Sequence, residues 1–473
     1  MAPCDGAART TNHNPETILR PSQSEFRALI SLATPIIVVQ VGLMTMGVVD
    51  SIMAGRFSAE ALAAIAIGNF YFFTVAMFGL GVLLVLDPLI AQAVGARDET
   101  AIALAVQRGL LLALVLSLVL GSLLLPAESV LRALRQPEPL APLAARYVLI
   151  CLPSFLPFNA FVVFRQLLQA QGFTRAIVAT IVLCNLANVA LNWALIFGNL
   201  GFPRLGVTGA ALATSISRTL LVVVLVALAW RRLKPYVWPV RRQAFERAPL
   251  LRMLRLGVPI GAQHELEVAY FGGLILLMGL LGTISVAAHQ AAINLASLTF
   301  MVPVGVASAT AVFVGRAVGA RDEPAVRRYA VAGLVCGVGF MCVAAAVFLL
   351  FPVALARLYS RDLEVVALAA GLIPIAGLFQ VFDGTQVVSA GILRGIGDTR
   401  FPMLAAALGF WLVGLPLSLA LGFRAQLGAE GLWWGSLVAL MIVAALLLYR
   451  VRMRLRRSMQ RVVIDGEQPR ASS

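Results

Sequence analysis

Residues 372–402 read LIPIAGLFQVFDGTQVVSAGIL followed by RGIGDTRFP. The apolar part is long enough to cross a bilayer as a helix, and one carboxylate, Asp383, interrupts it. An ionised Asp at the centre of a membrane helix costs about 2.5–3.5 kcal/mol on insertion scales, so such a residue is normally functional and has a partner. The stretch therefore predicts a membrane helix that carries part of a functional site.

The whole chain has the composition of an integral membrane protein. It has 473 residues, of which 60% are hydrophobic and 12% charged, and its mean hydropathy is +0.92. The apolar runs are continuous, which predicts helices instead of the alternating strands of a membrane barrel. Twelve runs are long enough to span a bilayer, and they cover residues 28–53, 61–86, 102–125, 143–168, 176–198, 206–230, 253–281, 284–314, 326–352, 364–393, 401–423 and 429–449.

Two features of the sequence occur twice at the same separation. VGARD stands at residues 94–98 and again at 318–322, and Pro35 in the first run corresponds to Pro259 in the seventh. Each copy contains an even number of predicted spans, so both copies enter the membrane from the same side. The pattern indicates a duplication into two parallel repeats, a common plan of transporters with the substrate cleft between the repeats.

The predicted fold is an all-α polytopic membrane protein with twelve transmembrane helices in two parallel six-helix lobes around a central cleft. The lobes comprise residues 28–230 and 253–450, and a basic cytoplasmic linker, residues 231–252, joins them. We expect residues 1–27 to be a disordered cytoplasmic tail and residues 451–473 to be a basic cytoplasmic tail.

The net charge of +15 is placed as in a membrane protein. With both termini in the cytoplasm, Lys and Arg concentrate in the cytoplasmic loops, as the positive-inside rule requires. This predicts a multi-pass protein of the cell inner membrane whose basic clusters contact anionic lipid headgroups, and it argues against nucleic-acid binding. The five cysteines show no paired spacing, and those within apolar runs are interpreted as core residues.

Motifs of soluble enzymes are missing from the sequence. Neither a GxxxxGK[ST] phosphate loop nor an HExxH metal-binding pattern occurs. We therefore expect a protein that is not an enzyme and needs no cofactor. The available chemistry rests on a small set of ionisable residues in otherwise apolar runs: Asp50, Asp87, Arg218, His264, Glu265, Glu267, His289 and Asp383.

Asp50 lies in the first run, after a proline, Pro35, that can bend the helix. A buried Asp can take up a proton near neutral pH, so this helix is a candidate proton or sodium switch. The alternative is an Asp at the membrane interface that only marks the helix end. Asn185, Asn188 and Asn192 share one helical stripe and either face Asp50 or hold helices together.

Glu265 and Glu267 in the seventh run point about 200° apart around a helix, so only one of them can face the interior. With Asp383, the inward Glu would supply two hard oxygen ligands for a small cation, or the pair would share a proton. The alternative is a structural hydrogen bond to a neighbouring helix. His264 and Asp87 are further candidates, and Asp87 precedes Pro88 at the expected membrane interface.

Two more ionisable residues lie within the apolar runs, and the sequence does not identify a partner for Arg218. His289 is interpreted as a histidine whose hydrogen bonds are satisfied in a contact between helices. Arg218 requires a carboxylate or a carbonyl oxygen.

Six segments in order resemble the multidrug and toxic compound extrusion (MATE) family. They are VVDSIMAGRFSAEALAAIA at 48–66, PLIAQAVGARD at 88–98, LLQAQGFTR at 167–175, NWALIFGNLGFPRLGVTGAALAT at 192–214, GTISVAAHQ at 282–290 and DGTQVVSAGILRGIGDTRFP at 383–402. The resemblance runs from about residue 25 to residue 450. It implies two six-helix lobes that form a V-shaped cleft, and export of amphipathic, often cationic compounds in exchange for Na⁺ or H⁺.

The resemblance also implies roles for individual residues. Asp50 corresponds to the family's first-helix aspartate, Pro35 to the point where that helix bends on protonation, and Asn188 and Asn192 to the accompanying amides. Glu267, in LEVAYF, resembles the seventh-helix glutamate of the sodium-coupled bacterial branch.

The tenth-helix aspartate of that branch corresponds to Asp383, so the resemblance implies a Na⁺ site at Glu267 and Asp383. His264 and Glu265 depart from the usual apolar or aromatic residues.

The expected mechanism is alternating access by a monomeric transporter, with binding partners that are membrane lipids and small amphipathic or cationic substrates. Candidate cleft residues are Met44, Phe158, Phe161, Tyr270, Phe300 and Phe379, and ordinary contacts between helices are the alternative for each. A lipid-linked or polysaccharide flippase is the nearer alternative function, and it would need a cationic cleft. A membrane-embedded enzyme is the more distant one.

Overall fold

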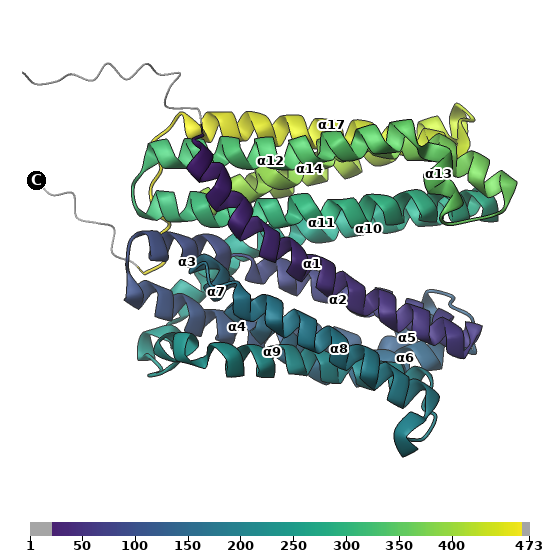
Figure 1. The fold of residues 1–473 in the computed structure, drawn as a ribbon, viewed down its shortest axis with the longest axis horizontal. Coiled ribbons are helices and arrows are strands. Elements are labelled where there is room, and N and C mark those ends of the chain that lie inside the picture. Colours follow the sequence, from purple (N-terminus) through teal and green to yellow (C-terminus); the bar gives the residue numbers. More distant parts are fainter. Residues whose placement is uncertain (1–20, 466–473) are drawn as a thin grey trace, which may run out of the picture.

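The computed structural model describes residues 21–465 of the chain, and all regular structure in that range is helical (Figure 1). The helices are α1 (Gln23–Phe57), α2 (Ala59–Leu83), α3 (Leu86–Gly95), α4 (Glu99–Leu124), α5 (Ala127–Ala133), α6 (Leu140–Cys151), η2 (Leu152–Ser154), α7 (Phe155–Ala170), α8 (Arg175–Phe197), η3 (Asn199–Gly201), α9 (Val207–Val237), η4 (Arg242–Phe245), α10 (Arg247–Leu280), α11 (Thr283–Gly319), α12 (Glu323–Leu350), α13 (Pro352–Arg357), α14 (Leu363–Ile396), α15 (Arg400–Ala406), η5 (Ala407–Gly414), α16 (Leu415–Leu419), η6 (Ala420–Arg424) and α17 (Gly428–Leu455).

The predicted membrane fold is confirmed. Within the described range, eleven helical segments are long and apolar enough to cross a membrane. The twelfth predicted span is α10, which is not among the eleven because polar residues at 263–267 interrupt its apolar sequence. The structure also subdivides two predicted spans, since α6 passes through η2 into α7 and the span at 401–423 consists of α15, η5, α16 and η6. The second span continues beyond its predicted end, where α2 is followed by α3.

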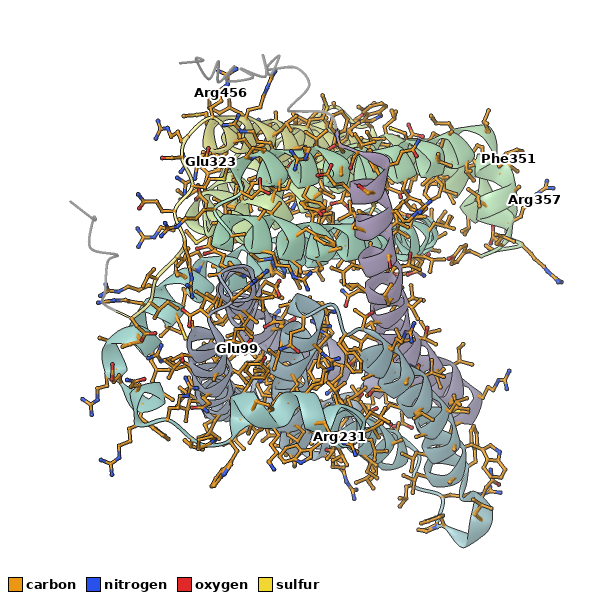
Figure 2. The ribbon with its side chains drawn as sticks, turned by 60° about the vertical axis from the view of Figure 1, so that its left-hand side comes forward. Glu99, Arg231, Glu323, Phe351, Arg357 and Arg456 are labelled. Carbon is orange, nitrogen blue, oxygen red and sulfur yellow. The ribbon has the colours of Figure 1, made fainter. Side chains whose placement is uncertain are left out.

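The helices form two lobes with separate hydrophobic cores (Figure 1). Elements α1 to α9 make up the N-terminal lobe, and α10 to α17 make up the C-terminal lobe. Both VGARD turns, residues 94–98 and 318–322, lie at one end of the molecule, which we call the VGARD end. Figure 2 shows Glu323 and Arg456 at this end of the C-terminal lobe and Phe351 and Arg357 at the opposite end.

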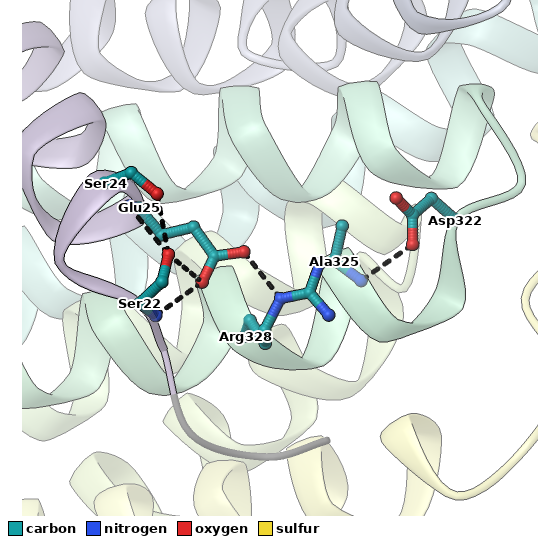
Figure 3. A network of polar contacts seen from close by, with 6 residues as sticks. All are labelled: Ser22, Ser24, Glu25, Asp322, Ala325 and Arg328. Carbon is teal, nitrogen blue, oxygen red and sulfur yellow. Dashed lines mark hydrogen bonds and ion pairs between the residues drawn. The ribbon is translucent and has the colours of Figure 1, made fainter. Parts of the chain in front are cut away.

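The first helix, α1, belongs to both lobes. A capping box at its start includes Glu25, whose carboxylate pairs with Arg328 of α12 in the C-terminal lobe at 2.5 Å (Figure 3). Leu29 is buried in the core of the C-terminal lobe, whereas Met46 is buried in the core of the N-terminal lobe. Pro35 lies inside the helix between these two sections.

Helix α10 crosses between the lobes in the same way. Met253, near its start, is buried in the core of the N-terminal lobe, and Leu274 is buried in the core of the C-terminal lobe. Pro259 lies between them, at the position equivalent to Pro35. Each lobe therefore sends the first half of its first helix into the other lobe, and each of these helices contains a proline near the crossing.

Glycines bring the two lobes into backbone contact at the VGARD end. A Cβ on Gly95 would overlap the carbonyl oxygen of Arg316, and a Cβ on Gly319 would overlap the carbonyl oxygen of Gln92. Gly95 and Gly319 are the glycines of the two VGARD copies, so the two contacts are equivalent by the duplication. The VGARD end is closed, with the repeats related by an approximate two-fold axis.

Both ends of the described chain contact the lobes. Helix α1 begins at Gln23, earlier than the predicted span at residue 28, because Ser22 caps it. The expected disorder therefore does not hold for residues 23–27, and residues 1–20 lie outside the described part of the chain. After α17, residues 456–465 are not helical, yet they contact both lobes.

Candidate functional sites in the two lobes

Asp50 is buried among three donors in the N-terminal lobe. Its Oδ1 accepts hydrogen bonds from the amides of Asn188, at 3.1 Å, and Asn192, at 2.6 Å. Its Oδ2 accepts from the Thr214 hydroxyl at 2.7 Å. The side chain is 5% exposed, and α1 continues to Phe57, so Asp50 does not mark the helix end. The predicted contact with Asn188 and Asn192 is present.

The third asparagine of the stripe has another role. Asn185 donates to the backbone oxygens of Gly42 and Ile181 and holds α1 against α8. Sequence reasoning missed Thr214, although it ends one of the quoted family-like segments. Its position one turn from Arg218 on α9 placed it near the ionisable residues, but only the fold shows which carboxylate it meets.

Arg218 lies against aromatic rings, and its charge acts on the Asp50 carboxylate without a direct ion pair. Its guanidinium lies over the ring of Phe72, 4.5 Å from the centroid, and 5.9 Å from that of Phe158. No ion pair to Arg218 occurs within residues 21–465. The negative faces of aromatic rings stabilise such a cation, so the charge stays in the interior of the N-terminal lobe.

Glu267 is the centre of the second site, in the C-terminal lobe. Its Oε1 accepts hydrogen bonds from the amides of Gln263, at 3.0 Å, and Gln386, at 2.7 Å. Both glutamines are buried. Glu265, by contrast, has a buried carboxylate oxygen without a hydrogen-bond partner. Of the two glutamates, Glu267 therefore faces the polar interior, and sequence reasoning missed both glutamines that contact it.

Asp383 lies on α14 one helical turn before Gln386 and near enough to Glu267 for the two charges to interact. Glu267 Oε2, which makes no hydrogen bond in the described residues, and the Asp383 carboxylate are hard oxygen donors of the kind that suit Na⁺ or a proton. Within the described residues, no group of three His, Cys, Asp or Glu could hold a metal. A Na⁺ here would therefore need amide or backbone oxygens besides the two carboxylates.

Asp87, expected near the membrane interface, lies inside the protein between the two lobes. Asp87 is buried, and it pairs across the two lobes with Arg394 of α14 at 3.2 Å. Arg165 of α7 donates to Gln40 of α1 at 3.3 Å. His264 lies close to the Arg394 charge. The interior of the protein is thus less acidic than the sequence suggested. Arg165 and Arg394, near the ends of predicted spans, place their side chains in this interior.

Three predicted cleft residues lie in the lobe cores instead. Phe161, Tyr270 and Phe379 are at most 2% exposed, since Phe161 packs within the N-terminal core and the other two pack within the C-terminal core. The Tyr270 hydroxyl contacts Ser418 and Ser436. The remaining candidates, Met44, Phe158 and Phe300, are partly buried.

His289 is buried in a contact between helices, but its ring nitrogens are not satisfied as the sequence interpretation expected. Its ring lies 5.6 Å from the ring of Trp433, and neither ring nitrogen has a hydrogen-bond partner.

Comparisons with known proteins agree with both the fold and the resemblance. A family model described as MatE matches residues 35–194 and 259–419. The chain is 38% identical over 468 residues to the probable multidrug resistance protein NorM of Mesorhizobium japonicum, covering 95% of this chain and 97% of that protein. It is 32% identical over 443 residues to the multidrug resistance protein NorM of Vibrio cholerae, covering 90% and 94%.

Two solved structures share the fold. The eukaryotic MATE transporter AtDTX14 matches with a TM-score of 0.83 at 21% identity, covering 91% of this chain and 99% of that one. A multidrug resistance MATE family transporter in an outward-facing conformation also matches with a TM-score of 0.83, at 20% identity, covering 93% and 97%.

Proposed function

The chain belongs to the MATE family of transporters, and we propose that it is a secondary antiporter that exports amphipathic, often cationic compounds in exchange for Na⁺ or H⁺. The proposal draws its substrate class from the multidrug resistance proteins that it resembles. It has no enzymatic activity and no cofactor beyond the coupling ion. The transporter works as a monomer in the cell inner membrane with both termini in the cytoplasm, so the VGARD end is the cytoplasmic end.

One observation carries the coupling mechanism: each lobe holds a carboxylate, buried at Asp50 and partly buried at Glu267, on the helix that crosses into the other lobe. Asp50 is on α1 and Glu267 is on α10, and both helices contact both cores. A proton or cation at either carboxylate changes the charge that its hydrogen-bond donors face. Because the same helix is part of the contact between lobes, this local change favours one arrangement of the lobes over the other.

The coupling is reciprocal. A cation at Glu267 and Asp383, or a proton on Asp50, favours the arrangement that releases the drug. By linkage, a bound drug must weaken cation or proton binding by the same factor. The conformation described here has its VGARD end closed and is the outward-facing state in this proposal.

The test is efflux of a fluorescent cation, such as ethidium, from proteoliposomes with the Na⁺ and pH gradients imposed separately. Na⁺-driven efflux that is lost in Glu267→Gln and Asp383→Asn would assign coupling to the C-terminal lobe. Efflux driven by the pH gradient and lost only in Asp50→Asn would assign it to the N-terminal lobe. Glu265→Gln is the matched control, since Glu265 lacks the amide contacts of Glu267.

Absence of efflux under both gradients, with folded protein in the membrane, would overturn the proposal. A lipid flippase assay would then be the next experiment. The buried Asp87–Arg394 pair and Arg165 are the residues to vary in that case, because a pyrophosphate group would require cationic partners.

A further inference from the structure

Residues 456–465 follow the last helix and cross from one lobe to the other. We call this segment the C-terminal strap. In Figure 1 it is the yellow segment that leaves α17 and runs along the VGARD end toward α3 and α4. Near its start, the backbone N–H of Met459 donates to the carboxylate of Glu323 on α12 at 3.4 Å. The strap thus begins on the C-terminal lobe.

Three further contacts attach the strap to the N-terminal lobe and to the start of α10. Arg461 pairs with Asp98, at the end of the first VGARD copy, at 3.0 Å. Ile464 is 8% exposed and belongs to the N-terminal core, and its carbonyl oxygen accepts from Arg252 at 2.6 Å. The strap is therefore docked by an ion pair, a buried apolar side chain and a backbone hydrogen bond.

Asp465 completes the docking by pairing with a buried arginine. The Arg108 side chain on α4 is 2% exposed and reaches the Asp465 carboxylate at 2.5 Å. The same guanidinium nitrogen, Nη2, also donates to the backbone oxygen of Gln243, in the linker between the lobes. A buried guanidinium without an anion is costly, and Asp465 is the carboxylate that Arg108 contacts.

The strap also meets the closed contact between the lobes. Gln92 donates its side-chain N–H to the carbonyl oxygen of Gly395 in the other lobe at 2.9 Å. The oxygen of the same amide accepts the backbone N–H of Val462 at 2.8 Å. Val462 lies against Gly397 at the end of α14. One strap residue thus contacts both sides of the closure.

We propose that the C-terminal strap is a latch that stabilises the closed VGARD end and must leave the N-terminal lobe before that end opens. The inference rests on the proposed alternation between two lobe arrangements. The Arg461–Asp98 pair is partly exposed, with Asp98 39% exposed, and such a pair contributes little by itself. Asp465 is 47% exposed while its partner Arg108 is buried, so the docked strap is held mainly because its release leaves Arg108 without an anion.

Thiol labelling at the closed contact tests the latch without any transport. Ala91 of α3 is fully buried where α3 meets Gly315 of α11, so Ala91→Cys reports opening of the VGARD end. The protein carries this change in a variant whose native cysteines are replaced by alanine. A membrane-impermeant maleimide is applied to the VGARD side of reconstituted protein, and the rate of labelling is measured.

Two latch variants are compared with this parent: Asp465→Asn and a chain that ends at Ser458. We expect each to increase the labelling rate, the truncation by about fivefold or more, as for a coupling of 1–3 kcal/mol. The matched control is Glu128→Gln, which breaks an exposed ion pair with Arg132 inside α5. Labelling rates equal to the parent in both latch variants would overturn the proposal.

Failure of the latch proposal can be distinguished from failure of the proposed antiport, because the two are tested by different measurements. Labelling measures opening directly, whereas the gradient experiments on Glu267 and Asp50 measure coupling. Faster labelling in a protein that shows no ion-driven efflux would leave the latch standing and remove the antiporter assignment.

Discussion

Gln92 and Arg316 stand at equivalent positions, each two residues before a VGARD copy, and each donates from its side chain to a backbone carbonyl of the opposite lobe. Gln92 reaches Gly395 at 2.9 Å, and Arg316 reaches Ala170 at 2.8 Å through Nε. The two acceptors are themselves equivalent, since each precedes the polar turn between two spans of its repeat. The duplication therefore produced a closure with one hydrogen-bonded contact per lobe.

Removing either donor is expected to favour opening of the VGARD end. Gln92→Leu or Arg316→Leu leaves a carbonyl without its side-chain donor and destabilises the closed state by about 1–3 kcal/mol. Spin labels at the exposed positions Thr100 and Pro324, on opposite lobes, would report a larger population of long distances. An unchanged distance distribution in both variants would show that these hydrogen bonds do not hold the closure.

In the N-terminal site, we expect Thr214→Val to reduce proton-coupled efflux by about tenfold or more, because a hydrogen bond to a charged group contributes about 1.5–3 kcal/mol. Valine preserves the shape but removes the donor to Asp50 Oδ2. Asn185→Ala is the control on the same side of the lobe, since Asn185 bonds only to backbone oxygens. Equal efflux in Thr214→Val and the parent would exclude a role for this hydrogen bond in coupling.

In the C-terminal site, Gln386→Leu is expected to weaken Na⁺ activation of efflux while the apparent affinity for the drug changes little. Gln386 donates to Glu267 from a neighbouring helix, so it fixes which carboxylate oxygen remains free for the cation. The measurement is the Na⁺ concentration for half-maximal efflux at saturating drug. Equal losses of Na⁺ and drug affinity would indicate a general defect of the lobe.

Acid should release the strap through Asp98. Burial raises the pKa of Asp98, but the hydrogen bond from the Ala101 backbone and the Arg461 guanidinium outweigh it and hold the pKa below its usual value. Because this pKa is lowered, the pairing of Asp98 with Arg461 stabilises the docked strap at any pH above the ordinary pKa of Asp. The stabilisation is lost as the pH falls through the lowered pKa, which lies below about pH 4.

The measurement is the fluorescence anisotropy of a dye on Val463→Cys, an exposed strap position, in purified protein that lacks native cysteines. Anisotropy should fall on acidification. Asp98→Asn should give lower anisotropy at neutral pH and a weaker acid transition. A transition that is identical in Asp98→Asn would assign the acid response to another group.

Much of this architecture follows from sequence because it depends on local or repeated patterns. Apolar runs predict the spans, the VGARD copies predict the duplication, and the helical spacing of Asn188 and Asn192 places both on the stripe that meets Asp50. Contacts between distant helices could not be predicted in this way. Gln386 reaches Glu267 because the tertiary fold brings this part of α14 near α10, and nothing in the sequence marks Gln386 among the buried amides.

The inter-lobe and strap contacts escaped prediction for the same reason. Asp87 looked interfacial because it precedes a proline, but closure of the lobes buries it against Arg394. Arg108 lies within a predicted span, and its partner Asp465 is 357 residues away in the chain. The partners of such side chains can be identified only from a structure in which the two lobes are placed together.

Gly319→Ala should open the VGARD end more strongly than the loss of one hydrogen bond. The added Cβ would overlap the carbonyl oxygen of Gln92, and a backbone atom cannot move aside as a flexible side chain can. The control is Gly339→Ala in α12, where a Cβ meets nothing within 4 Å. Alanine is favoured over glycine in a helix by up to about 1 kcal/mol, so the control should fold at least as well as the parent.

The distance between spin labels at Thr100 and Pro324 distinguishes the expected effects of the two glycine variants. Long distances should dominate in Gly319→Ala, and the parent distribution should persist in Gly339→Ala. If both glycine variants kept the parent distribution, the contact between α3 and α11 would accommodate the added Cβ without separation of the lobes. The close approach of the VGARD copies would then not be required for closure.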